Sequence, residues 1–320
     1  MPPGEFELIA RHFTRPVRKA VLGVGDDCAL LAPAPGMQLA VSSDMLVEGR
    51  HFLSTVAPDR LGHKALAVNL SDLAACGAEP LAFTLALAMP RADDSFLAPF
   101  AQGLFALAEA HAIELVGGDT TAGPLNICIT AFGQVPAGQA LLRNGARPGD
   151  HLWVSGTLGD ARLALEVFRG RVALAGEAFE SVRRAMELPQ PRTKLGVALR
   201  GVASSAIDLS DGLTGDLGHI LQRSGVGVTV EVDALPRSAV LAAQPLALQH
   251  ECLLAGGDDY ELLFTAPAAA EAAVRAAGSA AGVAVTRCGR IDAQAGLRVV
   301  DGAGRAVPTP WRGFDHFAAP

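Results

Sequence analysis

The sequence has few lysines and no long apolar run. Only three of its 320 residues are lysine, and acidic residues outnumber basic ones by 33 to 26, which gives a net charge of −7. This balance argues against a protein that binds nucleic acid through a basic face. No apolar stretch approaches the roughly 18 residues that a membrane-spanning helix needs, and the N-terminus lacks the apolar core of a secretory signal. We therefore expect a cytoplasmic protein that has no membrane segment.

The five cysteines form no CxxC pair and no regular framework. They are Cys28, Cys76, Cys128, Cys252 and Cys288. Spacing of this kind gives no sign of a disulfide scaffold or of a thiolate metal site. We expect reduced and mostly buried thiols, as in cytoplasmic proteins.

Several common catalytic signatures are also missing. The chain contains no GxxxxGK[ST] loop, no GxGxxG loop that opens a helix, no HExxH and no GxSxG. These absences argue against a P-loop nucleotide site, a zinc protease and a serine hydrolase. No lysine follows a glycine loop, so metal cations would have to neutralise part of any polyanionic ligand. The remaining candidates for chemistry are the carboxylates of the chain.

Composition and element pattern predict an α/β protein with two domains. Half of the residues are apolar, and only 5% are aromatic, so the core consists largely of small aliphatic side chains. Strands and helices mix without strict βαβ alternation, which favours two α/β layer domains over one doubly wound sheet. Turn clusters at 136–138 and 147–150 mark the boundary. The predicted domains are residues 1–137 and 148–320.

Apolar periodicity and turn residues predict the individual elements. The expected strands cover residues 20–24, 38–43, 81–89, 113–116, 125–135, 151–156, 204–209, 226–232, 260–265, 283–289 and 297–300. The expected helices cover residues 4–13, 58–77, 94–111, 159–168, 179–187, 193–200, 212–224 and 268–281. The nearly continuous apolar run at 81–89 predicts a strand that is covered on both faces. The helix at 58–77 places Asn69 and Asp72 on one face.

Aspartates beside small residues at predicted element ends are the main chemical signal. Packed carboxylates raise one another's pKa unless a cation joins them. Oxygen donors without histidine or thiol partners suit Mg²⁺ that bridges phosphates. Any single member could instead cap a turn, and Asp27 is the weakest. The set is Asp26, Asp27, Asp44, Asp72, Asp119, Asp208 and Asp211.

Three further features could support a phosphate ligand. Glycine pairs precede acids at 117–119 and 256–258, where a backbone could approach a ligand closely. Arg143 lies in a polar connection and could pair with a phosphate. By itself, however, Arg143 is more typical of a solvated surface residue, and His51 is more typical of a surface or core-edge histidine.

Seven segments that follow one another along the chain resemble the thiamine-monophosphate kinase family. Each is a weak signal alone, but the ordered series from residue 4 to the C-terminus is specific. The segments are 4–10 (GEFELIA), 23–31 (GVGDDCALL), 64–75 (KALAVNLSDLAA), 117–121 (GGDTT), 207–213 (IDLSDGL), 256–262 (GGDDYEL) and 311–317 (WRGFDHF).

The resemblance implies the two-domain PurM-like fold of aminoimidazole ribonucleotide synthetase. In that fold the N-terminal α/β domain dimerises through its strands, and the C-terminal α/β domain covers the ATP site. The implied reaction is ATP-dependent phosphorylation of thiamine monophosphate to thiamine diphosphate, the last step of thiamine diphosphate biosynthesis. The implied cofactor is Mg²⁺, several ions of it, and the implied assembly is a homodimer.

The resemblance also implies roles for individual residues. The magnesium shell would comprise Asp26, Ser42, Ser43, Asp44, Asp72, Asp119, Asp208 and Asp211. The ATP contacts would be Gly118, Asp119, Arg143 and Ser210. The substrate contacts would be His51, Asp258 and Phe314. Asp258 stands where the family often has Glu, and Phe314 where Tyr or Trp is common.

We expect no side chain to act as a general base. The nucleophile would be a phosphate oxygen of the substrate, which is already anionic at neutral pH, so the difficulty lies in aligning two polyanions. This chemistry favours direct in-line transfer without a phospho-enzyme.

Three alternatives stay open. One is another ATP-using enzyme of the same superfamily, although the reactive cysteines of selenophosphate synthetase and of the hydrogenase-maturation dehydratase have no counterpart here. Another is a non-catalytic protein that binds a nucleotide or thiamine phosphate. The last is an ordinary domain whose aspartates only cap turns, which predicts no magnesium-dependent ATP binding.

Overall fold

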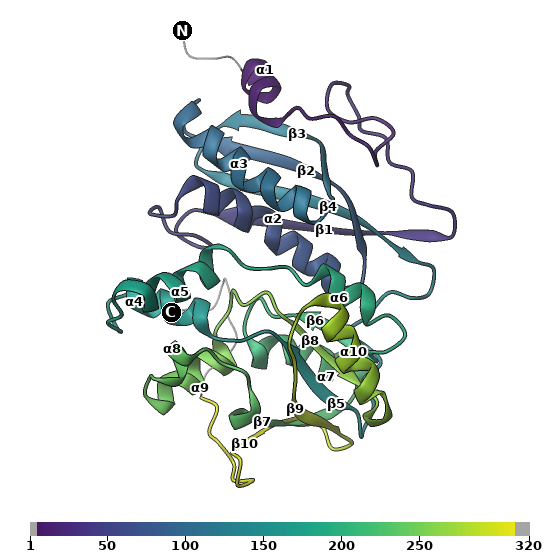
Figure 1. Cartoon of the computed structure of the whole chain (residues 1–320), viewed down its shortest axis with the longest axis vertical. Coiled ribbons are helices and arrows are strands. Elements are labelled where there is room, and N and C mark those ends of the chain that lie inside the picture. The colour runs from purple at the N-terminus through teal and green to yellow at the C-terminus, as the bar shows by residue number, and fades with distance from the viewer. Residues whose placement is uncertain (1–4, 311–320) are drawn as a thin grey trace. The chain divides into compact units, whose positions relative to one another are not determined.

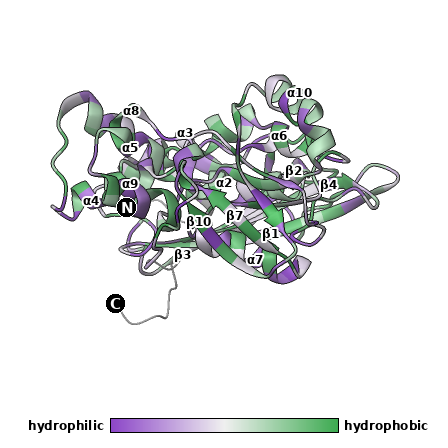
Figure 2. Cartoon of the chain, turned by 90° about the horizontal axis from the view of Figure 1, so that it is seen from below, coloured by the Kyte–Doolittle hydropathy of each residue, from purple (hydrophilic) through white to green (hydrophobic). Residues whose placement is uncertain are grey.

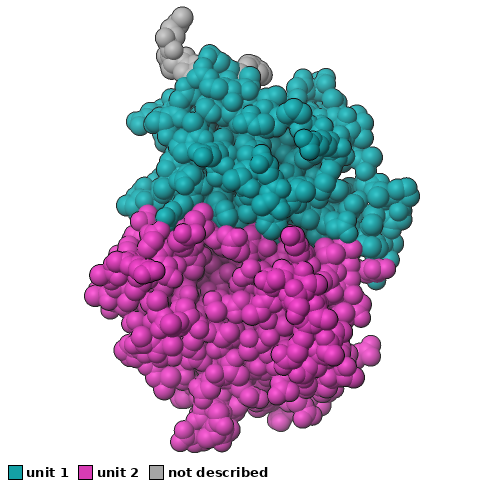
Figure 3. All heavy atoms as spheres, in the orientation of Figure 1, with its two compact units in different colours: residues 1–73, 78–138 teal, residues 74–77, 139–320 magenta. Residues whose placement is uncertain are grey.

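The computed structural model describes residues 5–310 (Figure 1). The chain divides into two compact units, which Figure 3 shows in different colours. The first unit comprises Met1–Leu73 and Ala78–Gly138, and the second comprises Ala74–Gly77 and Gln139–Pro320. In the described part of the chain, no helix has both the length and the apolar character that crossing a membrane requires.

The first unit is built on a four-stranded sheet in the order β1-β4-β2-β3. Its strands are β1 (Met37–Val47), β2 (Glu79–Met89), β3 (Glu114–Ala122) and β4 (Asn126–Pro136). Strand β4 pairs antiparallel with β1 and β2, whereas β2 and β3 are parallel. The unit also contains α1 (Glu5–Leu8), a π-helical turn (Ile9–Phe13), α2 (Pro58–Ala75) and α3 (Asp94–Ala110).

Helices α2 and α3 lie against one face of this sheet (Figure 1). They approach each other closely, since a Cβ atom at Gly62 would lie 2.0 Å from the Phe100 carbonyl oxygen. The reciprocal contact is equally tight, because a Cβ atom at Gly103 would lie 1.8 Å from the Asp59 carbonyl oxygen. The two helices cover that face with small and aliphatic side chains.

The opposite face of the sheet is partly exposed, which corrects the prediction that β2 is covered on both sides. Ala86 of β2 is exposed, and Thr84 and Ala88 on the same face are partly buried. On β1, Val41 and Met45 are 59% and 53% exposed. Figure 2 shows both hydrophobic and hydrophilic segments along β1. Small residues in β2 made the alternation between its faces hard to detect in the sequence.

The segment at 20–24 is not a strand, so that prediction is wrong. It forms two isolated bridges, Leu22 with Leu30 and Val24 with Asp26, and no continuous strand pairing. Val21 and Leu30 are exposed, and so are Asp26 and Asp27. Since the apolar run does not enter a core, its hydrophobicity gave a false strand signal.

Strand β3 extends further than expected. The Gly117-Gly118-Asp119 segment lies inside this strand and not beyond its end. Gly118 has a φ of +149°, and a Cβ atom there would lie 1.8 Å from the Leu85 carbonyl oxygen of β2. Only glycine allows the backbone of β3 to pass β2 at this point.

The second unit contains a six-stranded sheet in the order β10-β7-β9-β5-β8-β6. Strands β7 and β10 are parallel, and the other neighbours are antiparallel. The strands are β5 (His151–Ser155), β6 (Ser205–Asp208), β7 (Gly227–Glu231), β8 (Leu262–Ala266), β9 (Val285–Asp292) and β10 (Gly296–Val300). The helices are α4 (Asp160–Phe168), α5 (Gly176–Glu187), α6 (Thr193–Ala198), α7 (Leu213–Ser224), α8 (Ala239–Ala242), α9 (Leu246–Ala255) and α10 (Glu271–Ala281).

This sheet is buried on both faces by separate clusters. Leu152 and Val154 of β5 belong to the cluster that includes residues of α4, α7 and α9. Trp153, between them, belongs to the cluster that includes residues of α6 and α10. Alternate side chains along β5 therefore pack into two different hydrophobic clusters, one on each face of the sheet.

Two other expectations need correction. Helices α8 and α9 were not predicted, since α9 is apolar on most sides and lacks a clear 3.6-residue period. The cysteines are all free, but only Cys252 and Cys288 are buried, whereas Cys28 and Cys76 are exposed. The expectation of mostly buried thiols is therefore wrong.

Candidate active site

Strand β1 and helix α2 bring two predicted magnesium ligands together. The Ser42 hydroxyl donates a short hydrogen bond to the Asp72 carboxylate. Beside this pair, the buried Asn69 side chain accepts a hydrogen bond from the Asp44 backbone N–H at 3.2 Å and donates one to the Ala65 carbonyl oxygen at 3.2 Å. Asn69 thus ties the backbone of Asp44 to α2. The sequence placed Asn69 on the face of Asp72 but gave it no role; a buried amide in an apolar helix was the available signal.

Ser43 belongs to the opposite face of the sheet from Ser42. Its hydroxyl lies 2.9 Å from the Thr130 hydroxyl and 3.7 Å from the Cys128 sulfur on β4. Successive side chains of a strand point to opposite faces. The side chains of Ser42 and Ser43 therefore cannot both contact one ion within this unit.

Asp119 lies far across the sheet from Asp44. In the strand register Asp44 pairs with Ile129, which pairs with Leu85, which pairs with Gly118. Three strand spacings separate the two edges, about 14 Å at about 4.8 Å per spacing. One subunit therefore cannot place both carboxylates on the same ion, although the family resemblance implied a magnesium shell that contains both.

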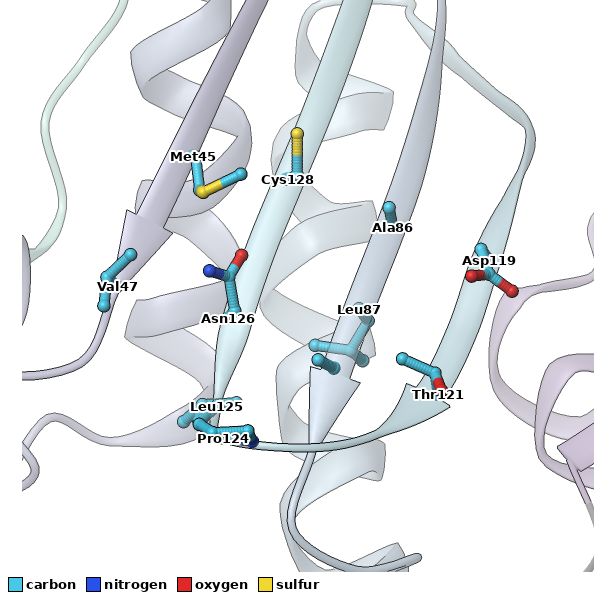
Figure 4. A pocket seen from close by; sticks show the side chains of 11 residues that line it. Met45, Val47, Ala86, Leu87, Asp119, Thr121, Pro124, Leu125, Asn126 and Cys128 are labelled. Atoms are coloured by element: carbon cyan, nitrogen blue, oxygen red, sulfur yellow. The ribbon is translucent and has the colours of Figure 1, made fainter.

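A shallow pocket of about 410 Å³ runs over the exposed face near Asp119 (Figure 4). Met45 and Val47 line it from β1, and Asp119 and Thr121 line it from β3. Most of the other lining residues are apolar. Asp119 is thus a carboxylate at the margin of an apolar surface.

The loop that carries Asp26 is anchored by Glu114, which was not among the predicted site residues. The Glu114 carboxylate, at the start of β3, accepts backbone N–H groups from Arg18 at 2.8 Å, Lys19 at 2.8 Å and Ala20 at 3.1 Å. Burial opposes ionisation, but these donors outweigh it and lower the pKa of Glu114. Glu114 therefore links this loop to the strand of Asp119.

His51 is oriented by its own turn. Its Nδ1 atom accepts the Val47 backbone N–H at 2.9 Å, so the neutral ring carries its proton on Nε2. Lys64, which is 2% exposed, donates from Nζ to the His51 carbonyl oxygen at 3.2 Å. The arrangement can present an N–H donor to an anionic ligand.

In the second unit, segments 208–211 and 257–260 lie side by side beyond the β6–β8 ladder. Tyr260 N–H donates to Leu209 O at 2.8 Å, and Asp258 N–H donates to Ser210 O at 2.9 Å. A Cβ atom at Gly257 would lie 2.5 Å from Ser210 O, so this approach requires glycine. The structure thus joins the predicted residues Ser210 and Asp258 through their backbones.

Asp216, in the first turn of α7, is hydrogen-bonded to the 208–211 segment. Its carboxylate accepts the Asp211 backbone N–H at 3.1 Å near the start of α7. Burial, and then the neighbouring Asp208 and Asp211 carboxylates, raise the pKa of Asp216 to about 8. Asp208 and Asp211 therefore lie close enough to Asp216 to interact electrostatically. Asp216 was not among the predicted residues, although a carboxylate in the first turn of a helix was a usable signal.

Arg143 is exposed, and its connection is fixed at two points. The Leu142 carbonyl oxygen accepts the Ala206 N–H of β6 at 2.9 Å. The Ser224 hydroxyl accepts the backbone N–H of Gly145 at 3.2 Å and donates to Arg143 O at 3.3 Å. Arg143 thus lies beside the edge strand that ends at Asp208.

The predicted acids are divided between the two units. Asp26, Asp44, Asp72 and Asp119 belong to the first, and Asp208 and Asp211 to the second. Among residues 5–310, no three His, Cys, Asp or Glu side chains converge on a point that could hold a metal ion. The donors available in each unit are carboxylate and hydroxyl oxygens, which fit a hard divalent cation such as Mg²⁺. Phe314 lies outside the described residues.

Two family models match most of the chain. The N-terminal domain of AIR synthase related proteins matches residues 25–135, and the corresponding C-terminal domain matches residues 147–302. The hydrogenase maturation protein HypE of E. coli, at 22% identity and a TM-score of 0.75, shares the fold. The fold is therefore the predicted two-domain PurM-like one.

Thiamine-monophosphate kinases are similar to this chain over its full length. The enzyme of Salmonella typhimurium is 47% identical, and that of Escherichia coli K12 is 45% identical, each over 100% of both chains. The crystal structure of thiamine-monophosphate kinase from Stenotrophomonas maltophilia K279a gives a TM-score of 0.85 at 45% identity, covering 94% of this chain and 95% of that one. A structure of AaThiL complexed with AMPPCP and TMP gives a TM-score of 0.76 at 29% identity, covering 89% of each chain. The chain belongs to the thiamine-monophosphate kinase family.

Proposed function

We propose that this chain transfers the γ-phosphoryl group of ATP to thiamine monophosphate, forming thiamine diphosphate in the last step of its biosynthesis. The observation that carries the proposal is identity of 45–47% to thiamine-monophosphate kinases over the whole chain. The AaThiL complex with AMPPCP and TMP supports the two substrates, because that relative binds an ATP analogue and TMP together.

We assign the oxygen donors of both units to several magnesium ions. The Ser42–Asp72 pair supports this role, and the separation of Asp44 from Asp119 supports more than one ion. Bound magnesium would neutralise charge on the phosphates. The proposed ligands are Asp26, Ser42, Ser43, Asp44, Asp72, Asp119, Asp208 and Asp211.

The remaining residues bind and orient the two substrates. We assign Gly118, Asp119, Arg143 and Ser210 to ATP, and His51, Asp258 and Phe314 to thiamine monophosphate. The Nε2–H of His51 and the guanidinium of Arg143 are donors suited to phosphate oxygens. The carboxylate of Asp258 suits the cationic thiamine moiety.

Transfer is direct and in line, with no side chain acting as a general base. The substrate phosphate is an anionic nucleophile, so the chain contributes positioning and charge compensation. Isotopically chiral γ-phosphate tests this step. We expect inversion of configuration at phosphorus, whereas retention would indicate a phospho-enzyme and contradict the proposal.

We also propose a cytoplasmic homodimer with domains at 1–137 and 148–320. Exposed apolar residues on β1 support an interface on that face of the first unit's sheet. Five free cysteines support a reducing compartment.

A non-catalytic binding protein is the alternative to exclude. Calorimetry with ATP and Mg²⁺ should show binding, and incubation with thiamine monophosphate should then yield thiamine diphosphate and ADP. Binding without any product would favour the binding protein. Absence of magnesium-dependent ATP binding would contradict both.

A further inference from the structure

The turn at residues 258–260 has an unusual backbone. Asp258 has a φ of +66° and Tyr260 a φ of +50°, both in the left-handed region. Aspartate visits this region with some frequency, but a bulky residue such as tyrosine is an outlier there. Such conformations persist where surrounding structure enforces them, and they cluster at functional sites.

Hydrogen bonds on both sides enforce this turn. The Asp258 and Tyr260 backbone N–H groups donate to Ser210 O and Leu209 O, at 2.9 and 2.8 Å. The Asp259 carboxylate accepts the Gly159 N–H at 2.8 Å. The next residue, Glu261, is buried and accepts hydrogen bonds from Ser155 and Arg192. The backbone of the turn is thus fixed from several elements of the second unit.

The two left-handed residues meet through their side chains. The Tyr260 hydroxyl donates to Asp258 Oδ1 at 2.9 Å. Tyr260 is 8% exposed, so its ring is held by packing and its hydroxyl has a defined position. It is also the only tyrosine of the chain. Glycine would relieve the backbone at position 260, but it could not supply this donor.

We propose that Tyr260 is a positioning residue for substrate binding. Its hydroxyl holds the Asp258 carboxylate in the orientation that receives the cationic thiamine moiety, and the left-handed turn brings the two side chains together. The inference rests on the proposed contact between Asp258 and thiamine monophosphate. Tyr260 acts through Asp258 and takes no part in the transfer itself.

The test is the kinetics of Tyr260→Phe, which removes the hydroxyl and keeps the ring. We expect KM for thiamine monophosphate to rise about 10-fold, the order expected for a lost hydrogen bond to a charged group. KM for ATP and kcat should stay within about 2-fold, because the ATP contacts are unchanged. Thr229→Val is the matched control, since Thr229 also donates a hydroxyl to a carboxylate, that of Asp292 at 2.7 Å, away from these segments.

A double-mutant cycle with Asp258→Asn shows whether Tyr260 acts through Asp258. Once Asp258 is replaced, Tyr260→Phe should have little further effect on KM for thiamine monophosphate. An unchanged KM in the folded Tyr260→Phe protein overturns the inference. An equal rise in KM for both substrates, or full additivity in the cycle, indicates a general structural role and also overturns it.

The same series separates this inference from the proposed function. If wild type makes thiamine diphosphate but Asp258→Asn leaves KM unchanged, the substrate contact and the role of Tyr260 are both wrong while the kinase activity stands. If wild type makes no thiamine diphosphate, the proposed function itself has failed.

Discussion

At the scale of single residues, three polar side chains that are not themselves predicted ligands hold the predicted ligands in place. Asn69 fixes the backbone of Asp44, Asp216 fixes that of Asp211, and Glu114 fixes the loop before Asp26. The sequence indicated the candidate ligands because their motifs resemble a family. It did not indicate these partners, because a hydrogen bond to a neighbouring backbone N–H leaves no motif, and those of Asn69 and Glu114 join separate segments of the chain.

Asn69→Ala should destabilise the first unit and weaken its response to magnesium. It leaves the Asp44 N–H without the side-chain acceptor and empties a buried position, which should lower the free energy of unfolding by about 1–3 kcal/mol. Chemical denaturation measures the change. Asn144→Ala, at an exposed asparagine, is the control. Equal stability of the two variants would contradict the role of Asn69.

Glu114→Gln should change how stability depends on pH. The folded-state pKa of Glu114 is lowered from its ordinary value of 4.5. The contribution of its ionised carboxylate to the free energy of unfolding is therefore fully present above pH 4.5. That contribution is lost as the pH falls through the lower folded-state pKa. Melting temperatures of wild type and variant between pH 3 and 6 test this. Wild type should be the more stable at pH 6, and the difference should shrink on acidification; a constant difference would contradict the assignment.

At the scale of elements, periodicity predicted most helices and strands of the described chain. The failures have physical causes. A short apolar run in a loop mimicked a strand at 20–24, and an apolar helix at Leu246–Ala255 lacked a polar face. Small residues concealed the open face of β2. The sequence alone did not indicate that β3 continues through Gly118, because this continuation depends on the close contact of β3 with β2.

Gly118→Ala should disrupt the pairing of β2 and β3. The new methyl group would meet the Leu85 carbonyl oxygen, and the φ of +149° would be strained. We expect a loss of about 2 kcal/mol or more in the free energy of unfolding. Gly117→Ala is the matched control, because a Cβ atom there meets only the Thr84 methyl group at 3.9 Å. Similar denaturation curves for the two variants would contradict this explanation.

At the scale of the whole molecule, the exposed face of the first unit's sheet bears on assembly. Val41→Asp should convert a dimer to a monomer, because it places a charge among apolar residues of β1. Leu246→Asp is the control, since Leu246 and Val41 are both 59% exposed but lie in different units. Sedimentation equilibrium measures the mass. A monomeric wild type, or a dimer unaffected by Val41→Asp, would contradict an interface on β1.

The family resemblance predicted the two-domain fold correctly, because an ordered series of motifs over the whole chain is specific. It could not show that Asp44 and Asp119 lie apart within the first unit, since their separation follows from the strand order of its sheet. Substitution of single aspartates tests the proposed site. Neighbouring acids in one exposed loop offer the sharpest comparison.

The central claim is that these aspartates support phosphorylation of thiamine monophosphate. The measurement is formation of thiamine diphosphate from ATP, Mg²⁺ and thiamine monophosphate by wild type, Asp26→Asn and Asp27→Asn. Replacing an outer partner of a metal site typically costs about 10–100-fold, so loss of a direct ligand in Asp26→Asn should reduce the rate by about 100-fold or more. Asp27→Asn should retain the wild-type rate. No product from wild type, or equal rates for the two variants, would contradict the account.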